Sequence, residues 1–225
     1  PGVDKVTIDD VHGSPGIVAL DSDSKPVVHP VFGTAPQVTP RLSPSNFMAL
    51  WADSVFWDGR AGPEVRDPLT GDVVIAAGGA LENQALGALM NDAEMAKRGR
   101  TWAELIADIA HAQPLALASD LPKDVARALA ATRTYQQLFA AAFGDESITP
   151  VRVAFALAAY QRTLVSDQTA FDRFEAGDAG AITGRALYGW RAFQAFRCNA
   201  CHTPPLFTND DFFQIGLRRA DFDLG

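Results

Sequence analysis

The chain has 225 residues, which is enough for one large domain or two small ones. Hydrophobic residues make up 48% and charged residues 20%, a composition typical of globular proteins rather than disordered ones. The formal net charge of −8 argues against nucleic acid and anionic membrane surfaces as partners, because both attract clusters of Lys and Arg, but it would suit a basic protein partner.

The first 79 residues are irregular in pattern. Pro, Gly, Asp and Ser punctuate residues 1–46, so we expect extended segments and turns there. Residues 47–60 form an aromatic patch that ends in a turn at Asp58-Gly59, and residues 61–79 are predicted to be an inserted loop. No apolar run in the chain reaches the roughly 18 residues that a membrane span needs, so none is expected. The chain begins with Pro1 and shows no signal peptide, so we expect a processed or clipped chain.

From residue 80 onward the apolar residues recur at helical spacing. Pro150 after Thr149 is typical of a first helical residue that follows an N-cap. Gly177, Asp178 and Gly180 break the pattern, so residues 166–180 are predicted to be a linker and residues 203–225 a loop. The predicted helices are 80–90, 101–112, 122–131, 133–143, 150–165 and 183–197.

The last predicted helix leads directly into Cys198-Asn199-Ala200-Cys201-His202, a C-x-x-C-H motif. This pattern is typical of a c-type haem attachment site, in which each thiol forms a thioether with a haem vinyl group. His202 is then predicted to be the proximal iron ligand. The two cysteines are too close in sequence for a disulfide framework.

Two other interpretations of the motif are weaker. A thioredoxin-like C-x-x-C requires a βαβ setting that this helical context lacks. A structural zinc ion requires four ligands, and only His12, His29 and His111 remain as further Cys or His candidates. The motif therefore predicts a covalently bound haem c. The sixth iron ligand would come either from Met48, Met90, Met95 or an upstream His, or from a segment beyond Gly225. We expect the second of these sources.

Further segments resemble signatures of bacterial di-haem cytochrome c peroxidases and their MauG-type relatives. They occur in the same order as in that family and cover about residues 40–220. The segments are R-L-S-P-S at 41–45, F-W-D-G-R-A at 56–61, Gln84 with Glu94-Met95, Y-Q-R-T-L-V-S at 160–166, F-D-R-F at 171–174, and P-L-F-T-N at 205–209 with Gly216.

The resemblance implies a mostly α fold of two cytochrome c-like helical haem domains, preceded by the Pro/Gly-rich irregular segment. Residues 1–166 would form the domain of the peroxidatic haem, and residues 167–225 the start of the electron-transfer domain. The family carries a first C-x-x-C-H before F-W-D-G-R-A that is absent here, so we expect it to lie before Pro1. Leu42 stands where the family usually has the Asn that helps to bind calcium, which puts that ion in doubt.

The resemblance also implies roles for three residues. Glu94 would be the acid/base that moves a proton during cleavage of hydrogen peroxide, with Gln84 hydrogen-bonded nearby. Trp57 would lie between the haems and carry an electron hole. Taken without the resemblance, Glu94 is typical of a solvated acidic helix end, Trp57 of a packing residue, and Gln84 indicates nothing.

The leading hypothesis is a periplasmic enzyme that reduces hydrogen peroxide to water with electrons from a small cytochrome c or copper protein. The periplasm is expected because c-type haem is attached outside the cytoplasm. One alternative is a MauG-type oxidase that acts on a protein substrate. Another is a non-catalytic electron-transfer cytochrome. A homodimer is left open as the assembly.

Overall fold

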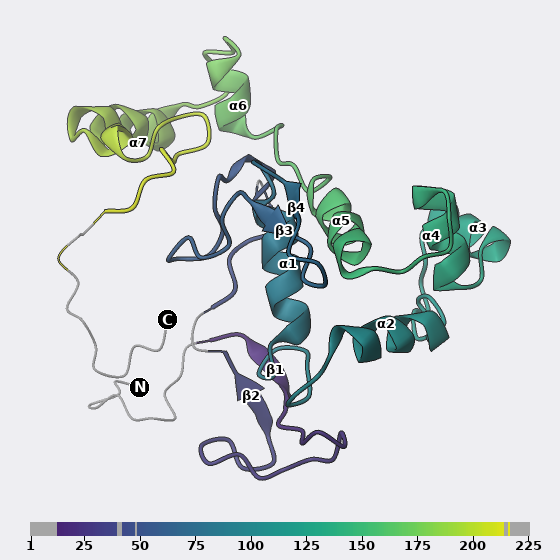
Figure 1. Cartoon of the computed structure of the whole chain (residues 1–225). Coiled ribbons are helices and arrows are strands. Elements are labelled where there is room, and N and C mark those ends of the chain that lie inside the picture. The colour runs from purple at the N-terminus through teal and green to yellow at the C-terminus, as the bar shows by residue number, and fades with distance from the viewer. Residues whose placement is uncertain (1–12, 40–41, 48, 214–215, 217–225) are drawn as a thin grey trace.

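The computed structural model describes residues 13–39, 42–47, 49–213 and 216. Over these residues helices dominate, with seven α-helices and four short strands (Figure 1). The predicted mostly α class is confirmed at this level. The elements are β1 (Pro15–Val18), β2 (Pro36–Val38), the 3₁₀ turn η1 (Ala49–Trp51), β3 (Val65–Arg66), β4 (Val73–Ile75), α1 (Ala80–Met90), α2 (Trp102–His111), α3 (Lys123–Ala131), α4 (Tyr135–Phe143), α5 (Pro150–Gln161), α6 (Ala170–Glu175), α7 (Gly184–Ala195) and the 3₁₀ turn η2 (Cys198–Ala200).

The irregular N-terminal segment contains an antiparallel pair, β1 and β2, joined by a long series of turns. Ser14 and Thr39 extend the pair, since the Ser14 N–H donates to Thr39 Oγ1 at 2.9 Å. The pair lies beside the C-terminal end of α1 (Figure 1). The prediction of extended segments and turns is confirmed for the part of residues 1–46 that the structure describes.

Residues 61–79 do not form the inserted loop that the sequence predicts. They contain a second antiparallel pair, β3 and β4, turned at Gly71, whose φ of +81° favours glycine. The β-branched run of β4 suits a strand, and Val65 in β3 is fully buried against α1. The Pro and Gly residues that suggested a loop mark the ends and turn of a hairpin instead.

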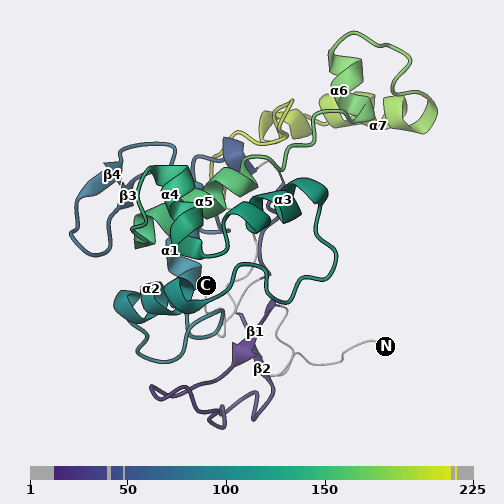
Figure 2. The ribbon, with the colours of Figure 1, turned by 90° about the vertical axis from the view of Figure 1, so that its right-hand side faces the viewer.

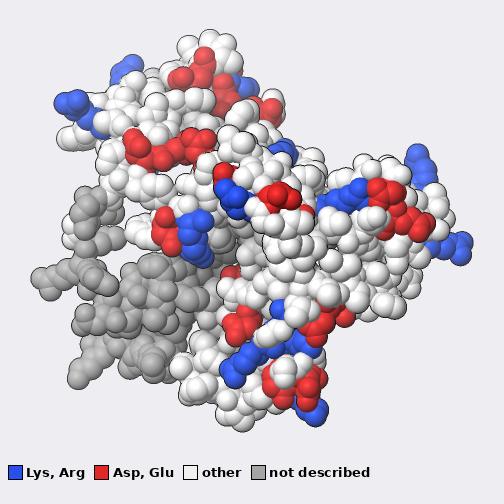
Figure 3. All heavy atoms as spheres, viewed as in Figure 1, with Lys and Arg blue, Asp and Glu red and all other residues white. Residues whose placement is uncertain are grey.

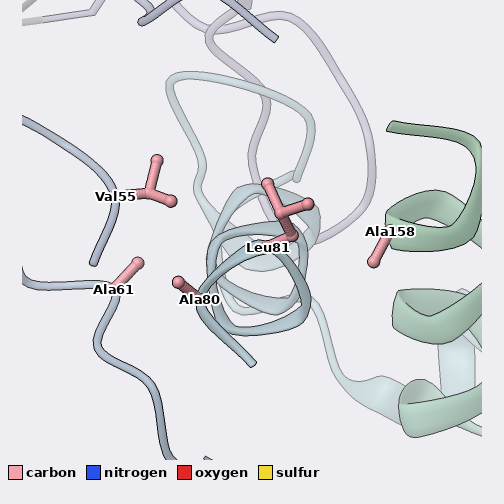
Figure 4. Packing of buried hydrophobic residues seen from close by; sticks show 5 residues of the cluster. All are labelled: Val55, Ala61, Ala80, Leu81 and Ala158. Atoms are coloured by element: carbon pink, nitrogen blue, oxygen red, sulfur yellow. The ribbon is translucent and has the colours of Figure 1, made fainter. Parts of the chain in front are cut away.

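The two helices α1 and α5 form the centre of the molecule. Small side chains line their contact: Ala85, Ala154 and Ala158 are almost completely buried, which lets the two backbones approach closely. Figure 4 shows one end of this core, where residues from three segments of the chain meet. That cluster consists of Val55 and Ala61 before β3, Ala80 and Leu81 in the first turn of α1, and Ala158 in α5.

Helices α2 and α4 pack against the other end of this pair. Trp102 begins α2 and contacts two of the buried clusters, as expected of a packing tryptophan. The predicted cap of α5 is confirmed, because Thr149 Oγ1 accepts the Arg152 N–H at 3.2 Å and Pro150 is the first helical residue. The buried residues of this end are Leu89, Leu105, Phe139, Ile148 and Val153.

The prediction that residues 166–180 form a linker is wrong in part, because they contain a short helix, α6. Thr169 and Asp172 form a reciprocal capping box, in which each side chain accepts the other residue's backbone N–H. The Thr-x-x-Asp pattern of this cap is visible in the sequence, but the glycines that follow it favour a linker. Helices α6 and α7 lie together at one end of the molecule, apart from the body formed by α1–α5 (Figures 1 and 2).

On the face shown in Figure 3, acidic and basic side chains lie close together in small groups, separated by broad uncharged surface. The net charge of −8 is thus not gathered into one block on this face. Within the described residues, the model has no helix with the length and apolar character needed to cross a membrane.

Candidate functional site

The C-x-x-C-H motif forms a tight turn at the end of α7. Arg197, in the left-handed region with φ of +60°, ends the helix, and η2 begins at Cys198. Cys198 O then accepts two backbone N–H groups, from Cys201 at 3.3 Å and from His202 at 3.0 Å. Both cysteines are free and exposed, so the turn holds two accessible thiols and an imidazole together.

The His202 ring is oriented by its own loop. Its Nδ1 lies 3.1 Å from the carbonyl oxygen of Phe207, so an Nδ1–H tautomer donates to that carbonyl. The ring is exposed, and Nε2 is then left as the metal-binding nitrogen. A backbone carbonyl that fixes the ring in this way is a common feature of metal-bound histidines.

Aromatic side chains surround the motif. Phe207 lies 4.9 Å from Phe171 and 5.9 Å from Phe193 between ring centroids, and Phe193 lies 6.3 Å from His202. Further large apolar side chains of this region are exposed to solvent, which is unusual for so many together. They are Tyr188, Phe196 and Leu206. A haem is planar and largely apolar, so one attached to the two thiols and bound by the imidazole would cover these side chains.

A second site is a cavity of about 580 Å³ between α1, α2, α4 and α5. Its size is within the range of small-molecule and cofactor sites, roughly 300–1,000 Å³. The lining is mainly apolar, with a few polar groups. The lining residues are Asn46, Gln84, Ala85, Ala88, Leu89, Met95, Asp108, Ile109, Ala112, Tyr135, Phe139, Val153, Ala156, Leu157 and Gln161.

Of the three residues with predicted roles, Gln84 lines this cavity, and Met95, the neighbour of Glu94, lines it as well. Gln161 joins Gln84 in the cavity wall although its position within an apolar helix did not single it out in the sequence. The available signal was a polar residue at the C-terminal end of a helix that is otherwise rich in Ala, Val and Leu. The arrangement gives an apolar cavity two side-chain amides.

Glu94 lies in a turn that follows α1, and its side chain is half-buried. Glu94 Oε1 accepts the Asn91 side-chain N–H at 3.2 Å. The turn is tightened by Asn91 O, which accepts the N–H groups of Met95 at 2.9 Å and Ala96 at 2.8 Å. Glu94 is therefore held by a compact turn rather than by a frayed helix end, and it does not itself line the cavity, although its neighbour Met95 does.

Trp57 stands at the tip of a different turn, at residues 55–61. Val55 and Ala61 pair across its base, and the Gly59 N–H donates to Phe56 O at 3.1 Å. Phe56 adopts φ of +75°, a strained conformation for a bulky residue, and the Arg60 guanidinium lies 3.8 Å from the centroid of its ring. This turn presents the Trp57 side chain with 63% of its area exposed, outside the cavity lining.

A smaller, polar cavity of about 280 Å³ adjoins the turn of Glu94 and shares Met95 and Asp108 with the larger one. Two ion pairs line it: Lys97–Glu104 at 2.9 Å and Arg100–Asp108 at 2.6 Å. The pKa of Glu104 is lowered to about 2, chiefly because its carboxylate accepts the Thr101 backbone N–H and then because Lys97 donates to it.

Several candidates from the sequence fall elsewhere. Arg41, Met48 and His12 lie outside the described residues. In the part of the chain that the structure describes, no group of three or more His, Cys, Asp or Glu side chains could hold a metal ion, so no zinc site is found there.

A family model and several known proteins are similar to this chain, and they indicate the same family. Residues 21–180 match the family model described as di-haem cytochrome c peroxidase. The methylamine utilization protein MauG of Methylophilus methylotrophus is 33% identical over 188 residues, which cover 82% of this chain and 44% of that protein. The cytochrome c peroxidase Ccp of Escherichia coli is 28% identical over 193 residues, which cover 86% of this chain and 33% of that protein.

A second MauG protein, from Methylorubrum extorquens, is 44% identical over 103 residues, which cover 45% of this chain and 29% of that protein. The chain spans less than half of the length of each of these relatives. The matched residues 21–180 include the residues that line the cavity, and the relatives contain further sequence.

Proposed function

Because this chain belongs to the family of di-haem cytochrome c peroxidases, we propose that its protein reduces hydrogen peroxide to water in the bacterial periplasm. The electrons would come from a small cytochrome c or copper protein. Residues 1–166 belong to the domain of the peroxidatic haem, and residues 167–225 begin the domain of the electron-transfer haem. The separation of α6 and α7 from the α1–α5 body supports this division (Figure 1).

Cys198, Cys201 and His202 hold the electron-transfer haem in this proposal. The haem supplies an iron that changes oxidation state and so passes electrons on. The two thiols attach it, His202 Nε2 binds the iron, and the Phe207 carbonyl keeps the imidazole in one orientation. The exposed aromatic side chains around the motif support this role, because a haem would shield them from water.

The cavity between α1, α2, α4 and α5 is the place proposed for the peroxidatic haem. Its apolar walls exclude water, and the amides of Gln84 and Gln161 can hydrogen-bond to polar groups inside it. The proposed mechanism needs both haems, one to receive electrons and one to react with hydrogen peroxide. A haem content near one per full-length protein, measured as pyridine haemochrome, would instead favour a non-catalytic cytochrome.

Glu94 is proposed as the acid/base. Its Oε1 accepts a hydrogen bond from Asn91, which orients the carboxylate and leaves Oε2 to take a proton from hydrogen peroxide and return it to the leaving oxygen. Trp57 is proposed to carry the electron hole between the two domains. Its turn is held rigidly by internal hydrogen bonds, which supports a fixed position for the indole.

The observation that carries the proposal is the placement of the Glu94 turn beside a cofactor-sized cavity that Gln84 and Met95 line. Glu94→Gln tests it, because Gln keeps the side-chain volume but cannot take the proton. In the full-length protein with both haems, peroxide turnover should fall by about 10²–10⁴-fold. Unfolding stability should change by no more than about 0.5 kcal/mol.

Glu146→Gln is the matched control, since Glu146 is exposed on the loop before α5 and, unlike Glu94, has no sequence neighbour that lines a cavity. It should leave turnover unchanged. A decrease of less than about threefold for Glu94→Gln, far below the effect of a general acid/base, would remove Glu94 from the mechanism.

A second candidate function is the oxidation of residues on a protein substrate, because two of the relatives are named MauG. Both activities use the same proposed sites, so steady-state kinetics must separate them. Rapid turnover of peroxide with a reduced small redox protein supports the peroxidase. Slow turnover with such donors, together with oxidation of a protein substrate, supports the alternative.

A further inference from the structure

The turn that carries Glu94 depends on a distant part of the chain. Two of its backbone carbonyls face outward from the turn and accept hydrogen bonds from the β1–β2 pair. Asp92 O accepts the Gln37 side-chain amide at 2.9 Å, and Ala93 O accepts the Ile17 backbone N–H at 3.1 Å. The donor and the acceptor of each of these hydrogen bonds are more than 50 positions apart in the sequence.

Gln37 joins three segments at one point. It lies in β2 and is 8% exposed, and its Nε2 contacts Ile17 O of β1 at 3.4 Å as well as Asp92 O. Gln37 and Glu82 are the buried polar or charged residues of the described chain. A buried amide costs free energy unless it is hydrogen-bonded, so its occurrence here indicates a specific positional need.

Gly16 shows how closely β1 lies against the turn. A Cβ atom at this position would lie 1.7 Å from Ala93 O, which is far too close. Because Ala93 O is a backbone atom, no side-chain movement could relieve the clash. Only glycine therefore allows this approach. Beyond the turn, the Arg98 N–H donates to Leu20 O at 3.1 Å and Lys97 Nζ donates to Ser22 O at 2.6 Å.

We propose that the β1–β2 pair is a brace for the Glu94 turn, and that Gln37 is a positioning residue for the acid/base. The consequence for catalysis rests on the proposed role of Glu94. Apart from the internal hydrogen bonds of Asn91, the turn has no helix or strand of its own to hold it, so the position of the carboxylate also depends on these external bonds. Small displacements of a catalytic group, on the order of 1 Å, can lower a rate by about 10²-fold.

The test uses Gln37→Met in the full-length protein with both haems, because Met keeps the length of the side chain but donates no hydrogen bond. Hydrogen exchange of the peptide covering residues 91–97 should become at least about threefold faster. Peroxide turnover number should fall about tenfold while the Michaelis constant changes less than twofold. Gln113→Met is the matched control, since Gln113 is exposed after α2, and it should alter neither quantity.

A double variant separates positioning from general destabilisation. In the Glu94→Gln background, Gln37→Met should lower turnover no further, because the carboxylate it positions is already gone. An equal decrease in both backgrounds would overturn the proposal. So would an exchange rate for residues 91–97 no greater than that of the Gln113→Met control.

Gly16→Ala tests the brace from its other strand, with Gly62→Ala as control because a Cβ on Gly62 meets nothing within 4 Å. Only the first should accelerate exchange at residues 91–97. The unmodified protein provides a check that needs no variant: the Ile17 amide should be protected as strongly as the Met95 and Ala96 amides. Exchange is independent of peroxide turnover, so the brace can be confirmed even if Glu94 proves not to be the acid/base.

Discussion

The two ring nitrogens of His202 have different surroundings, and that difference decides what the residue can bind. Nδ1 is engaged by the Phe207 carbonyl, whereas the exposed side of the ring is available to a metal. Cys198 and Cys201 lie on the same short turn directly before His202, so three exposed groups lie within five residues of the chain. The chemistry of the motif is thus local, and a few residues suffice to specify it.

This locality gives a prediction for the attachment of haem. Wild-type full-length protein should retain haem on a denaturing gel, because thioether bonds survive unfolding. Cys198→Ala with Cys201→Ala should remove the haem of the C-terminal unit and reduce the covalent haem to about half, since two haems are proposed. Haem staining and pyridine haemochrome measure this. Unchanged staining in the double variant would show that another site holds the haem.

At the scale of the elements, the ion pair with the most buried carboxylate among the described residues lies where α1 meets α5. Glu82, whose side chain is 5% exposed, binds Arg162 at 2.6 Å and 3.0 Å in a bidentate arrangement. Arg162 also contacts Gly78 O at 3.4 Å, so it ties together the start of α1 and the end of α5. Arg162 directly follows Gln161, which lines the cavity. It also begins the segment that leads from α5 to α6.

Arg162→Met should destabilise the protein by about 3 kcal/mol, because it leaves the Glu82 carboxylate buried without a partner. Arg66→Met removes the exposed Arg66–Glu64 ion pair and should cost less than about 1 kcal/mol. Urea unfolding of both variants gives the comparison. Adding Glu82→Gln to Arg162→Met should recover part of the loss, and equal losses for the two Arg variants would contradict this account.

At the scale of the whole molecule, the segment after α7 contacts a part of the chain more than 150 residues earlier. Phe212 there reaches the turn of Trp57: a Cβ atom on Gly59 would lie 2.5 Å from Phe212 Cζ. The contact joins the unit that carries Cys198, Cys201 and His202 to the turn that presents Trp57. It therefore bears directly on how the two proposed haem domains are placed.

Gly59→Ala and Gly71→Ala test this contact as a matched pair. Both glycines have positive φ, so each substitution should cost about 1–2 kcal/mol from backbone conformation alone. A Cβ on Gly71 meets nothing within 4 Å, whereas on Gly59 it collides with Phe212. Gly59→Ala should therefore cost at least about 1 kcal/mol more in urea unfolding, and Phe212→Ala should abolish that excess. Equal costs in both positions would show that Phe212 does not dock there.

Much of the helical content followed from the sequence alone, since helices α1 and α5 begin at the residues that periodicity and the Thr149–Pro150 cap predict. The family and the haem motif were also predicted, because C-x-x-C-H and F-W-D-G-R-A are contiguous patterns whose meaning does not depend on distant residues. The roles of Glu94, Gln84 and Trp57 remain predictions that the proposed variants test.

The sequence by itself determined what is local: the helical periods, the caps and the spacing of two thiols and an imidazole. Tertiary structure decided what depends on distant partners. Gln161 becomes a cavity residue only because α5 packs against α1, and Gln37 gains importance only because β2 reaches the turn after α1. Likewise β3 and β4 form a hairpin because Val65 is buried against α1. The physical reason is that burial and long-range hydrogen bonds select among local conformations whose intrinsic free energies differ little.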